Sequence, residues 1–483
     1  MNPRASEMPR RPAASGRRRI VPHPSVEERV ARGKAARSAV PRSSHARFEP
    51  ASDRRDPVEL LEQQAATRVA DLVPIRYGRM LASPFAFYRG AALIMAADLA
   101  TTPVSGVSVQ LCGDAHLSNF GVFASPERRL VFDLNDFDET LPGPWEWDVK
   151  RLAASMAVAG RDKGLAAKQR TEIVRETIAG YRRAMRDFAA MRNLDVFYTH
   201  LDADALIAGL GDQLTEHMRE RADRALAKAH TSDSSKALSR LTAVVDGRPQ
   251  IVSDPPLIET IDDLFPAEEA ARFRESMHDL LRSYRSTLSP DRRRALEGFR
   301  LVDFARKVVG VGSVGTRAYI ALLLGRDDQD ALFLQFKEAQ ASVLERFAGK
   351  SPHANEGERV VSGQRLMQAS SDIFLGWQRS TGSDGVRRDF YVRQLKDWKG
   401  SFDIDEAVAK GLALYGRTCG WTLARAHARS GDRIAIAAYL GRGDRFDCAL
   451  ADFAEAYADQ NERDYAALAE AVESGRIAAR PDV

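Results

Sequence analysis

Apolar residues recur every three or four positions along much of the chain, a spacing that predicts helices with one buried face. Ala65, Val69 and Leu72 show this spacing within a predicted helix that begins near residue 58. The helices predicted in this way span residues 58–80, 90–100, most of 148–246, 270–296, 339–347, 407–429 and 449–474. Shorter apolar runs predict strands at residues 107–111, 120–123, 130–134, 319–324, 332–336, 373–377 and 390–395.

The predicted strands gather in two places along the chain, and helices fill the rest. The sequence therefore predicts an α+β protein with a mostly helical lobe over residues 51–300 and a β-rich lobe over residues 301–400. A helical segment over residues 401–483 is expected to return to the first lobe. Hydrophobic residues make up 44% of the 483 residues, which is enough to bury a large core.

The first 50 residues differ from the rest in charge. They hold twelve Lys or Arg and four Asp or Glu, together with seven prolines and few large apolar residues. This composition predicts a disordered basic tail. Such a tail either contacts nucleic acid, acidic lipid or a partner, or is a solvated Arg-rich leader or a transit peptide. The whole chain has a net charge of only +4, which argues against nucleic-acid binding outside this tail.

Cysteine content and hydropathy bear on the compartment. Cys112, Cys419 and Cys448 are too few for a disulfide scaffold or a Cys-rich zinc module, and they fit a reducing compartment. No purely apolar run is longer than that of residues 318–324, which is far short of the roughly 20 residues of a membrane-spanning helix. No signal peptide is expected near residue 1. We therefore expect a cytoplasmic protein without a membrane span, and the sequence leaves its oligomeric state open.

Two acidic motifs carry the first candidate chemistry. Residues 113–119 read Gly-Asp-Ala-His-Leu-Ser-Asn and place Asp114 and Asn119 in a loop after a predicted strand. Residues 132–139 put Asp133, Asp136 and Asp138 at the end of a second strand. Carboxylate and amide oxygens suit Mg²⁺ better than zinc, so these residues are candidate metal ligands for phosphoryl transfer. The alternative is a loop in which Asp and Asn only stabilise a turn.

The Gly-Asp-x-His-x-x-Asn motif resembles the catalytic loop of aminoglycoside- and choline-kinase-like phosphotransferases, which share the protein-kinase-like fold. The resemblance implies that Asp114 is the catalytic base, that His116 shapes the loop and that Asn119 binds Mg²⁺. It also implies a second metal ligand. We favour Asp136 for this role because an aromatic residue follows it, whereas Asp133 is a rival by its spacing from Asn119.

A second motif, at residues 310–315, matches the pattern Gly-x-Gly-x-x-Gly. This pattern occurs in dinucleotide-binding folds, where a helix follows it, and in kinases, where a strand follows it. Predicted strands follow it here. The sequence therefore favours a phosphate-binding loop made by Gly310, Gly312, Ser313 and Gly315.

Lys337 ends the predicted strand at residues 332–336, where it resembles the lysine of the Val-Ala-Ile-Lys strand of kinases. The kinase template makes it the ligand of the α- and β-phosphates of ATP. Glu345, on the predicted helix at residues 339–347, is the expected ion-pair partner, with Glu338 and Glu358 as alternatives. The other interpretation is a strand-end lysine whose ammonium group reaches solvent.

The two motifs occur in the reverse of the usual kinase order, because the glycine-rich motif comes long after Asp114. If both interpretations hold, the chain is a circularly permuted, two-lobed kinase-like protein. Residues 423–427 (Leu-Ala-Arg-Ala-His) resemble the helix that precedes the catalytic loop in small-molecule kinases, which supports this order. Residues 394–401 would then form the adenine-binding hinge, with Arg393, Lys396 and Lys399 as nearby cations. Asp148 either matches an Asp that opens a helix in these kinases or simply caps its helix.

The whole chain resembles still more closely a bacterial family known as domain of unknown function 2252. The resemblance rests on residues 83–90 (Ser-Pro-Phe-Ala-Phe-Tyr-Arg-Gly), 113–121, 135–139, 145–151, 310–315 and 391–400, and it covers most of residues 50–470. It implies no established activity. Arg89, in the first of these strings, either binds a phosphate or an acidic substrate or forms a structural ion pair. Arg393 is a second candidate for such a contact.

Together these motifs lead us to expect an ATP- and Mg²⁺-dependent phosphotransferase whose acceptor is a hydroxyl group of a small molecule. Three alternatives stay open. They are a nucleotide-binding pseudokinase or regulator without transfer activity, nucleotidyl transfer in place of phosphoryl transfer, and an NAD-dependent oxidoreductase that uses the glycine-rich motif.

Overall fold

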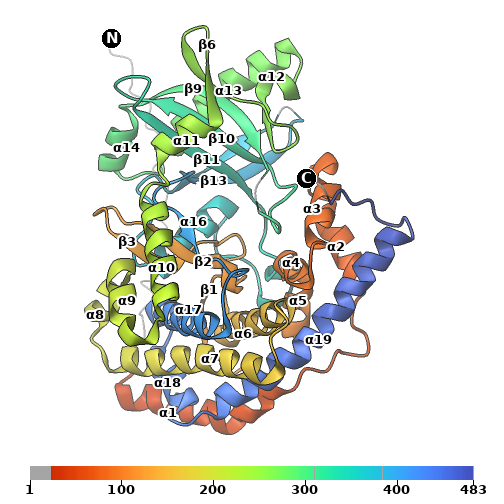
Figure 1. Cartoon of the computed structure of the whole chain (residues 1–483), viewed down its shortest axis with the longest axis vertical. Coiled ribbons are helices and arrows are strands. Elements are labelled where there is room, and N and C mark those ends of the chain that lie inside the picture. Colours follow the sequence, from red (N-terminus) through yellow and green to blue (C-terminus); the bar gives the residue numbers. More distant parts are fainter. Residues whose placement is uncertain (1–22, 309, 383, 482–483) are drawn as a thin grey trace, which may run out of the picture.

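The structure is a computed structural model that describes residues 23–308, 310–382 and 384–481 (Figure 1). It is a mixed α and β fold, with a six-stranded sheet and its covering helices at one end and a larger helical body at the other. No helix among these residues is both long and apolar enough to cross a membrane.

The six-stranded sheet is antiparallel throughout. Its strands lie in the order β12 (Gly376–Thr381), β13 (Arg387–Gln394), β11 (Ala331–Ala339), β10 (Ala318–Leu324), β9 (Arg300–Lys307) and β8 (Ile258–Thr260). Side chains alternate between its faces, so Ala321 and Leu323 of β10 pack in one apolar cluster while Ile320 and Leu322 pack in another. Because both faces are covered, β10 and β11 are almost wholly buried and appear as continuous apolar runs in the sequence.

Helices that precede β9 cover this sheet. Met277 and Tyr284 of α13 (Ala267–Arg285) pack on one face, and Leu238 of α11 (Ser234–Leu241) packs on the other. We expected residues 51–300 to form the helical lobe. Within this range, α11 and α13 pack on the sheet.

The helical body is built around four long helices, α6 (Trp145–Asp162), α7 (Ala167–Ala190), α17 (Ala409–Ser430) and α19 (Arg445–Glu473). α17 lies against α7 over much of its length. Two glycines permit this approach, because a Cβ added to Gly416 or Gly420 would lie 2.1 Å from atoms of Thr177. The body therefore joins the last part of the chain to its first half.

Three small sheets and many shorter helices complete the fold. The sheets are β1 (Ser108–Leu111) with β4 (Leu141–Pro144); β14 (Gly400–Ser401), β2 (Phe120–Ala124), β3 (Leu130–Leu134) and β5 (Leu201–Asp202); and β6 (Thr242–Val245) with β7 (Arg248–Ile251). The other α-helices are α1 (Val26–Ala39), α2 (Pro57–Ala65), α3 (Val73–Met80), α4 (Pro84–Gly90), α5 (Ala92–Leu99), α8 (Asn193–Tyr198), α9 (Ala203–Leu210), α10 (Glu216–His230), α12 (Ile261–Leu264), α14 (Pro290–Leu296), α15 (Glu345–Ala348), α16 (Glu356–Met367) and α18 (Arg433–Leu440). Short 3₁₀ helices are η1 (Arg42–Ala46), η2 (Ala70–Leu72), η3 (Leu117–Asn119) and η4 (Gly211–Gln213).

The prediction of a disordered basic tail over residues 1–50 is wrong for residues 26–46. Helix α1 packs on α18 through Gly33, where an added Cβ would lie 2.1 Å from the carbonyl oxygen of Ala435. His45 of η1 is buried and its Nε2 lies 2.6 Å from the hydroxyl of Tyr439. Glycine and histidine contacts of this kind leave no hydrophobic pattern in the sequence. Residues 1–22 of the expected tail lie outside the described residues.

Three further predictions about secondary structure differ from the structure. The predicted helix at residues 339–347 does not exist as such, because β11 continues to Ala339 and α15 begins only at Glu345. The helix that accompanies the sheet is α16, at residues 356–367. The strand expected at residues 373–377 begins instead at Gly376. Residues 58–80 form two helices, α2 and α3, because residues 66–72 between them turn and include η2.

Candidate active site

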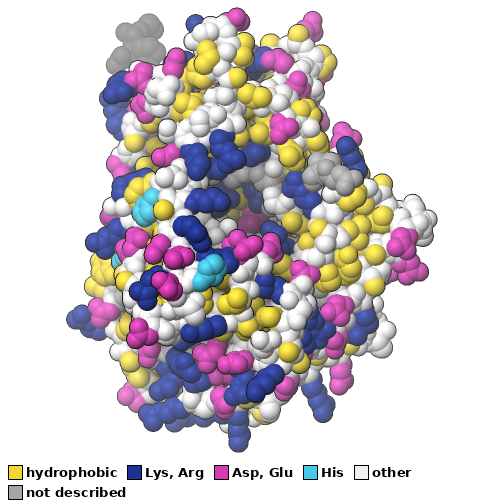
Figure 2. All heavy atoms as spheres, viewed as in Figure 1, with side chains coloured by type: hydrophobic (Ala, Val, Ile, Leu, Met, Phe, Trp, Pro, Cys, Tyr) yellow, Lys and Arg dark blue, Asp and Glu magenta, His cyan; other side chains and the backbone are white. Residues whose placement is uncertain are grey.

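A cleft of about 1190 Å³ lies between the six-stranded sheet and the helical body. One wall includes Asp114, Asn119 and Asp136, and the opposite wall includes Gly312 and Ser313 of the glycine-rich loop. Figure 2 shows the surface hollowed in this region, with Lys and Arg side chains gathered along its edge. The two motifs that lie far apart in the sequence therefore line one cavity.

The loop at residues 113–119 is fixed by a buried carboxylate. Asp148 of α6 accepts hydrogen bonds from the backbone N–H groups of Cys112, at 2.8 Å, and Gly113, at 3.0 Å. His427 of α17 places its Nε2 3.2 Å from the same carboxylate, and the hydroxyl of Tyr181 lies 2.9 Å from its other ring nitrogen. Asp148 does not cap α6, because that position is taken by Pro144. Asp148 and His427 therefore hold the loop in place.

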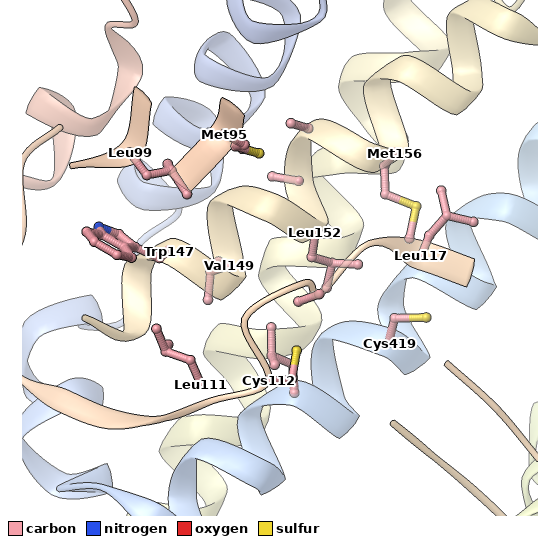
Figure 3. Packing of buried hydrophobic residues seen from close by; sticks show 14 of the residues in the cluster. Met95, Leu99, Leu111, Cys112, Leu117, Trp147, Val149, Leu152, Met156 and Cys419 are labelled. Carbon is pink, nitrogen blue, oxygen red and sulfur yellow. The ribbon is translucent and has the colours of Figure 1, made fainter. Parts of the chain in front are cut away.

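Apolar packing against α6 and α17 also fixes the loop at residues 113–119. Figure 3 shows Cys112 and Leu117, at the two ends of the loop, among Leu152 and Met156 of α6 and Cys419 of α17. Gly113 has a φ of +85°, and a Cβ there would lie 2.2 Å from the carbonyl oxygen of Glu139. Only glycine fits this position without a shift of the backbone.

Asp114 points its carboxylate toward the cleft. One of its oxygens accepts a 2.8 Å hydrogen bond from Nε of Arg151 on α6 and forms an ion pair with Nη2 at 2.7 Å, and the other lies 3.8 Å from Nε2 of His116. Burial raises the pKa of Asp114 to about 6, although the neighbouring Arg151 opposes this rise. A carboxylate with such a pKa is well suited to accept a proton near neutral pH.

His116 and Asn119 shape the loop around Asp114. Nδ1 of His116 accepts a hydrogen bond of 3.2 Å from the N–H of Ser118, and burial holds the pKa of His116 well below its usual value. The side-chain amide of Asn119 donates to the backbone oxygen of Asp114, at 2.7 Å. This bond uses the nitrogen of Asn119 and leaves its amide oxygen as a possible ligand in the cleft.

The three acids of the second motif differ in their surroundings. Asp133 is 1% exposed and does not line the cleft, since its carboxylate pairs with Arg425 and accepts from the N–H of Ala369 at 2.9 Å. The choice of Asp133 as a metal ligand by spacing therefore does not fit the structure. Asp136 lines the cleft, and the only hydrogen bond found to its side chain among the described residues is the 3.2 Å bond from the N–H of Asp138.

Asp138 joins the two walls of the cleft. Its carboxylate forms an ion pair with Lys337 of β11 and accepts from the hydroxyl of Tyr391, at 2.8 Å, and that of Ser313, at 3.3 Å. Burial opposes ionisation of Asp138, but Lys337 outweighs it and the pKa stays below the usual value. Lys337 is 2% exposed, so the interpretation of a solvent-reaching lysine is wrong.

Lys337 does not pair with any of the three glutamates expected for it. Glu345 lies 3.5 Å from Lys350, and Glu358 lies 3.6 Å from His353. Glu338 instead pairs with two arginines, Arg317 at 3.3 Å and Arg388 at 3.7 Å. The expected pair fails because residues 339–344 are not helical, and Glu345 therefore does not return over the sheet.

The glycine-rich loop connects β9 to β10. Gly310, Gly312 and Ser313 line the cleft, whereas Gly315 does not; its φ is +89° and its ideal Cβ position lies 3.0 Å from Cβ of Arg68. Strand β10 follows Gly315, and a dinucleotide-binding fold requires a helix at that point.

The segment that links β13 to the helical body, residues 394–401, lies next to the second acidic motif. Arg393 donates to the backbone oxygen of Asn135, at 3.1 Å, and to Gln335, at 3.2 Å, and it does not line the cleft. Gly400 and Ser401 pair with β2 next to the loop at residues 113–119. The charge of Arg393, followed by burial, lowers the pKa of Lys399 to about 7. This region is the expected hinge, residues 394–401.

Sequence reasoning did not identify Arg151 as a site residue. It stands three positions after Asp148 on α6, so one turn of this helix contacts the loop through both residues. Among the described residues no group of three or more His, Cys, Asp or Glu is arranged to hold a metal ion. Of the three candidate metal ligands that line the cleft, Asp138 pairs with Lys337, which leaves Asn119 and Asp136 to offer oxygens to a metal.

Comparison with known protein families adds one result. Residues 68–471 match the family described as "Uncharacterized protein conserved in bacteria (DUF2252)". The chain belongs to this family. No curated protein and no solved structure matches this chain.

Proposed function

We propose that this member of the DUF2252 family is an ATP- and Mg²⁺-dependent phosphotransferase that acts on a hydroxyl group of a small molecule. The observation that carries the proposal is the contact of Asp138 with Lys337 and Ser313, because it joins the acidic motif to the glycine-rich loop across one cleft. A cytoplasmic location, where ATP is present, is part of the proposal.

The residues of the cleft have distinct roles in this proposal. Asp114 accepts the proton of the attacking hydroxyl, and Arg151 holds its carboxylate in position. Lys337 and the glycine-rich loop bind the phosphates of ATP. Asn119 and Asp136 would hold Mg²⁺, which neutralises charge on the phosphates when bound. The oxygen donors of these two side chains fit such a hard cation.

The fold in this proposal is protein-kinase-like and circularly permuted. Strands β9, β10 and β11, with the glycine-rich loop and Lys337, form the nucleotide-binding half. Residues 394–401 then lead to α17 as the adenine-binding hinge. The catalytic loop at residues 113–119, which a kinase would carry after α17, stands near the start of this chain and contacts α17 through Asp148 and His427.

A transfer assay with ³²P-labelled ATP and a panel of small alcohols tests the proposal. Wild-type protein is expected to transfer label, and Asp114→Asn is expected to be at least about 10²-fold slower with unchanged affinity for Mg-ATP. Binding of Mg-ATP without transfer to any acceptor or to water would support a pseudokinase instead. Thermal stabilisation by NAD(H) but not by Mg-ATP would overturn the proposal, and mass spectrometry of the product separates phosphoryl from nucleotidyl transfer.

A further inference from the structure

Three arginines at one side of the cleft lack acidic partners. Arg68 follows α2, Arg76 lies on α3 and Arg89 lies on α4. Within the described part of the chain, none of them forms a hydrogen bond or ion pair with a carboxylate. Arg68 donates to the backbone oxygen of Val314, and Arg76 donates to Gln64, at 2.6 Å, and to the backbone oxygen of Gly90, at 2.9 Å.

Several nitrogens of this arginine cluster are buried without a partner among the described residues. They are Nε of Arg68, Nε and Nη1 of Arg76, and Nε of Arg89. Burial lowers the pKa of all three guanidinium groups. Arg76 is fully buried, and Arg68 and Arg89 are half-buried. Withdrawing a cation from water without a compensating charge is costly, so a fold that keeps these three side chains together has a reason other than stability.

Several buried arginines elsewhere in the protein pair with carboxylates. Arg182 pairs with Asp447 at 2.6 Å, and Arg425 pairs with Asp133. Arg54 pairs with two carboxylates, those of Asp98 and Asp464, each at 2.7 Å. Arg429 and Arg433 also lack a carboxylate partner, but they donate to carbonyl oxygens. The arginine cluster combines the absence of a carboxylate partner with buried, unbonded nitrogens beside the cleft.

The arginine cluster is next to the candidate base. Arg68 and Arg89 both line the cleft, together with Gln64 and Thr67. The carbonyl oxygen of Tyr88, the neighbour of Arg89, accepts a 2.8 Å hydrogen bond from Arg151, the same side chain that holds Asp114. Arg76 is fully buried and contributes only its charge. Acids lie near the two arginines without a direct pair: Asp114 and Asp405 near Arg89, and Glu139, Asp138 and Glu338 near Arg68.

We propose that Arg89 and Arg68, supported by the charge of Arg76, bind an anionic group of the phosphoryl acceptor, a carboxylate or a phosphate. The inference rests on the proposed function, which it deepens. The acceptor is then an acidic alcohol, held with its hydroxyl group at Asp114 and its anionic group at the arginine cluster. Guanidinium groups suit both anions because their N–H groups match two oxygens at once.

Calorimetric titration of the full-length chain tests this site. The probes are inorganic phosphate and glycerol 2-phosphate, titrated with and without a saturating non-hydrolysable ATP analogue and Mg²⁺. Both probes are expected to bind in the presence of the analogue. Arg89→Gln should weaken their binding at least about tenfold, which corresponds to about 1.4 kcal/mol, and leave the affinity for the analogue unchanged.

Two control variants accompany Arg89→Gln. Arg192→Gln removes a surface guanidinium whose side chain is 87% exposed and should change none of the affinities. Arg89→Lys keeps the charge but loses the paired N–H geometry, so its affinity for the probes should fall between those of wild type and Arg89→Gln. No hydrogen bond to the side chain of Arg89 is found in the described residues, and its charge is uncompensated, so the thermal midpoint of Arg89→Gln should equal or exceed that of wild type.

The outcomes separate the possible sources of the anion. If the analogue excludes both probes and Arg89→Gln weakens the analogue itself, the cluster binds nucleotide phosphates and the inference is overturned. Wild-type protein that binds neither probe at millimolar concentration also overturns it. Probe binding that depends on Arg89, in a protein that binds no analogue, supports the anion site and refutes the proposed function.

Discussion

Replacement of Asp148 tests how the candidate active site is held together. Its carboxylate accepts two backbone hydrogen bonds, from Cys112 and Gly113, and lies 3.2 Å from Nε2 of His427, all in the buried interior. Hydrogen bonds to a charged group contribute about 1.5–3 kcal/mol each. Asp148→Ala removes both and leaves two buried N–H groups unpaired, so the free energy of unfolding should fall by about 3–5 kcal/mol.

Asp148→Asn should lower the free energy of unfolding by less than Asp148→Ala. Its amide oxygen can still accept from one N–H group, whereas its NH₂ group would face the second donor, and we expect a loss of about 2 kcal/mol. Urea unfolding followed by tryptophan fluorescence measures both variants, because Trp145 and Trp147 stand on the same turn of α6 as Asp148.

Asp195→Ala is the matched control. Asp195 pairs with Arg192 on the surface, 2.8 Å away, and because water screens this exposed pair its removal should leave the urea midpoint close to that of wild type. An Asp148→Ala variant that unfolds at the same urea concentration as wild type would refute the reasoning. It would mean that the loop at residues 113–119 keeps its shape without the buried carboxylate.

Three further predictions concern the cleft and the core. The rate of transfer should rise between pH 5 and pH 7 with a midpoint near 6, because the base must lose its proton and the pKa of Asp114 is about 6; a flat pH profile would remove Asp114 from the proton transfer. Lys337→Ala should weaken Mg-ATP binding at least about tenfold by calorimetry, since it removes the cation expected at the phosphates, and equal affinity would contradict that role. Arg425→Met should destabilise the protein by about 3–5 kcal/mol because it leaves Asp133 buried without a cation, whereas the double variant Asp133→Leu, Arg425→Met should recover most of this loss in the same urea assay. Failure of the double variant to recover would indicate that Asp133 has a role beyond the ion pair.

Regular elements with strong patterns could be predicted from the sequence. The helix expected at residues 407–429 is α17, and the strands expected at residues 319–324 and 332–336 are β10 and β11. These elements are buried over most of their length, so packing reinforces the pattern. The helix predicted at residues 339–347 is wrong because the apolar spacing there is helical but the backbone is not. The first of these residues extends β11, and only residues 345–348 form a helix.

The parts of the site that could not be predicted depend on residues far apart in the sequence. The local signals for Asp133 and Asp136 conflict, because spacing from Asn119 makes Asp133 a rival whereas the aromatic residue after Asp136 favours Asp136. Asp133 is withdrawn from the cleft by Arg425, which stands 292 positions later. In the same way Lys337 pairs with Asp138 and not with Glu345. Pairing of buried charges depends on tertiary packing, which a pattern within one segment does not contain.

The position of α17 bears on the reversed order of the two motifs. This helix contacts the acidic motif and its loop at three buried points: Arg425 pairs with Asp133, His427 lies against Asp148, and the hydroxyl of Tyr415 donates to the backbone oxygen of Leu117 at 2.8 Å. Each contact is costly to break because its groups are removed from water. Together they fix the loop relative to α17 whichever of the two comes first in the chain. The order of the motifs along the sequence is therefore no argument against a shared cleft, because the geometry of the site is set by these contacts and not by the connection between them.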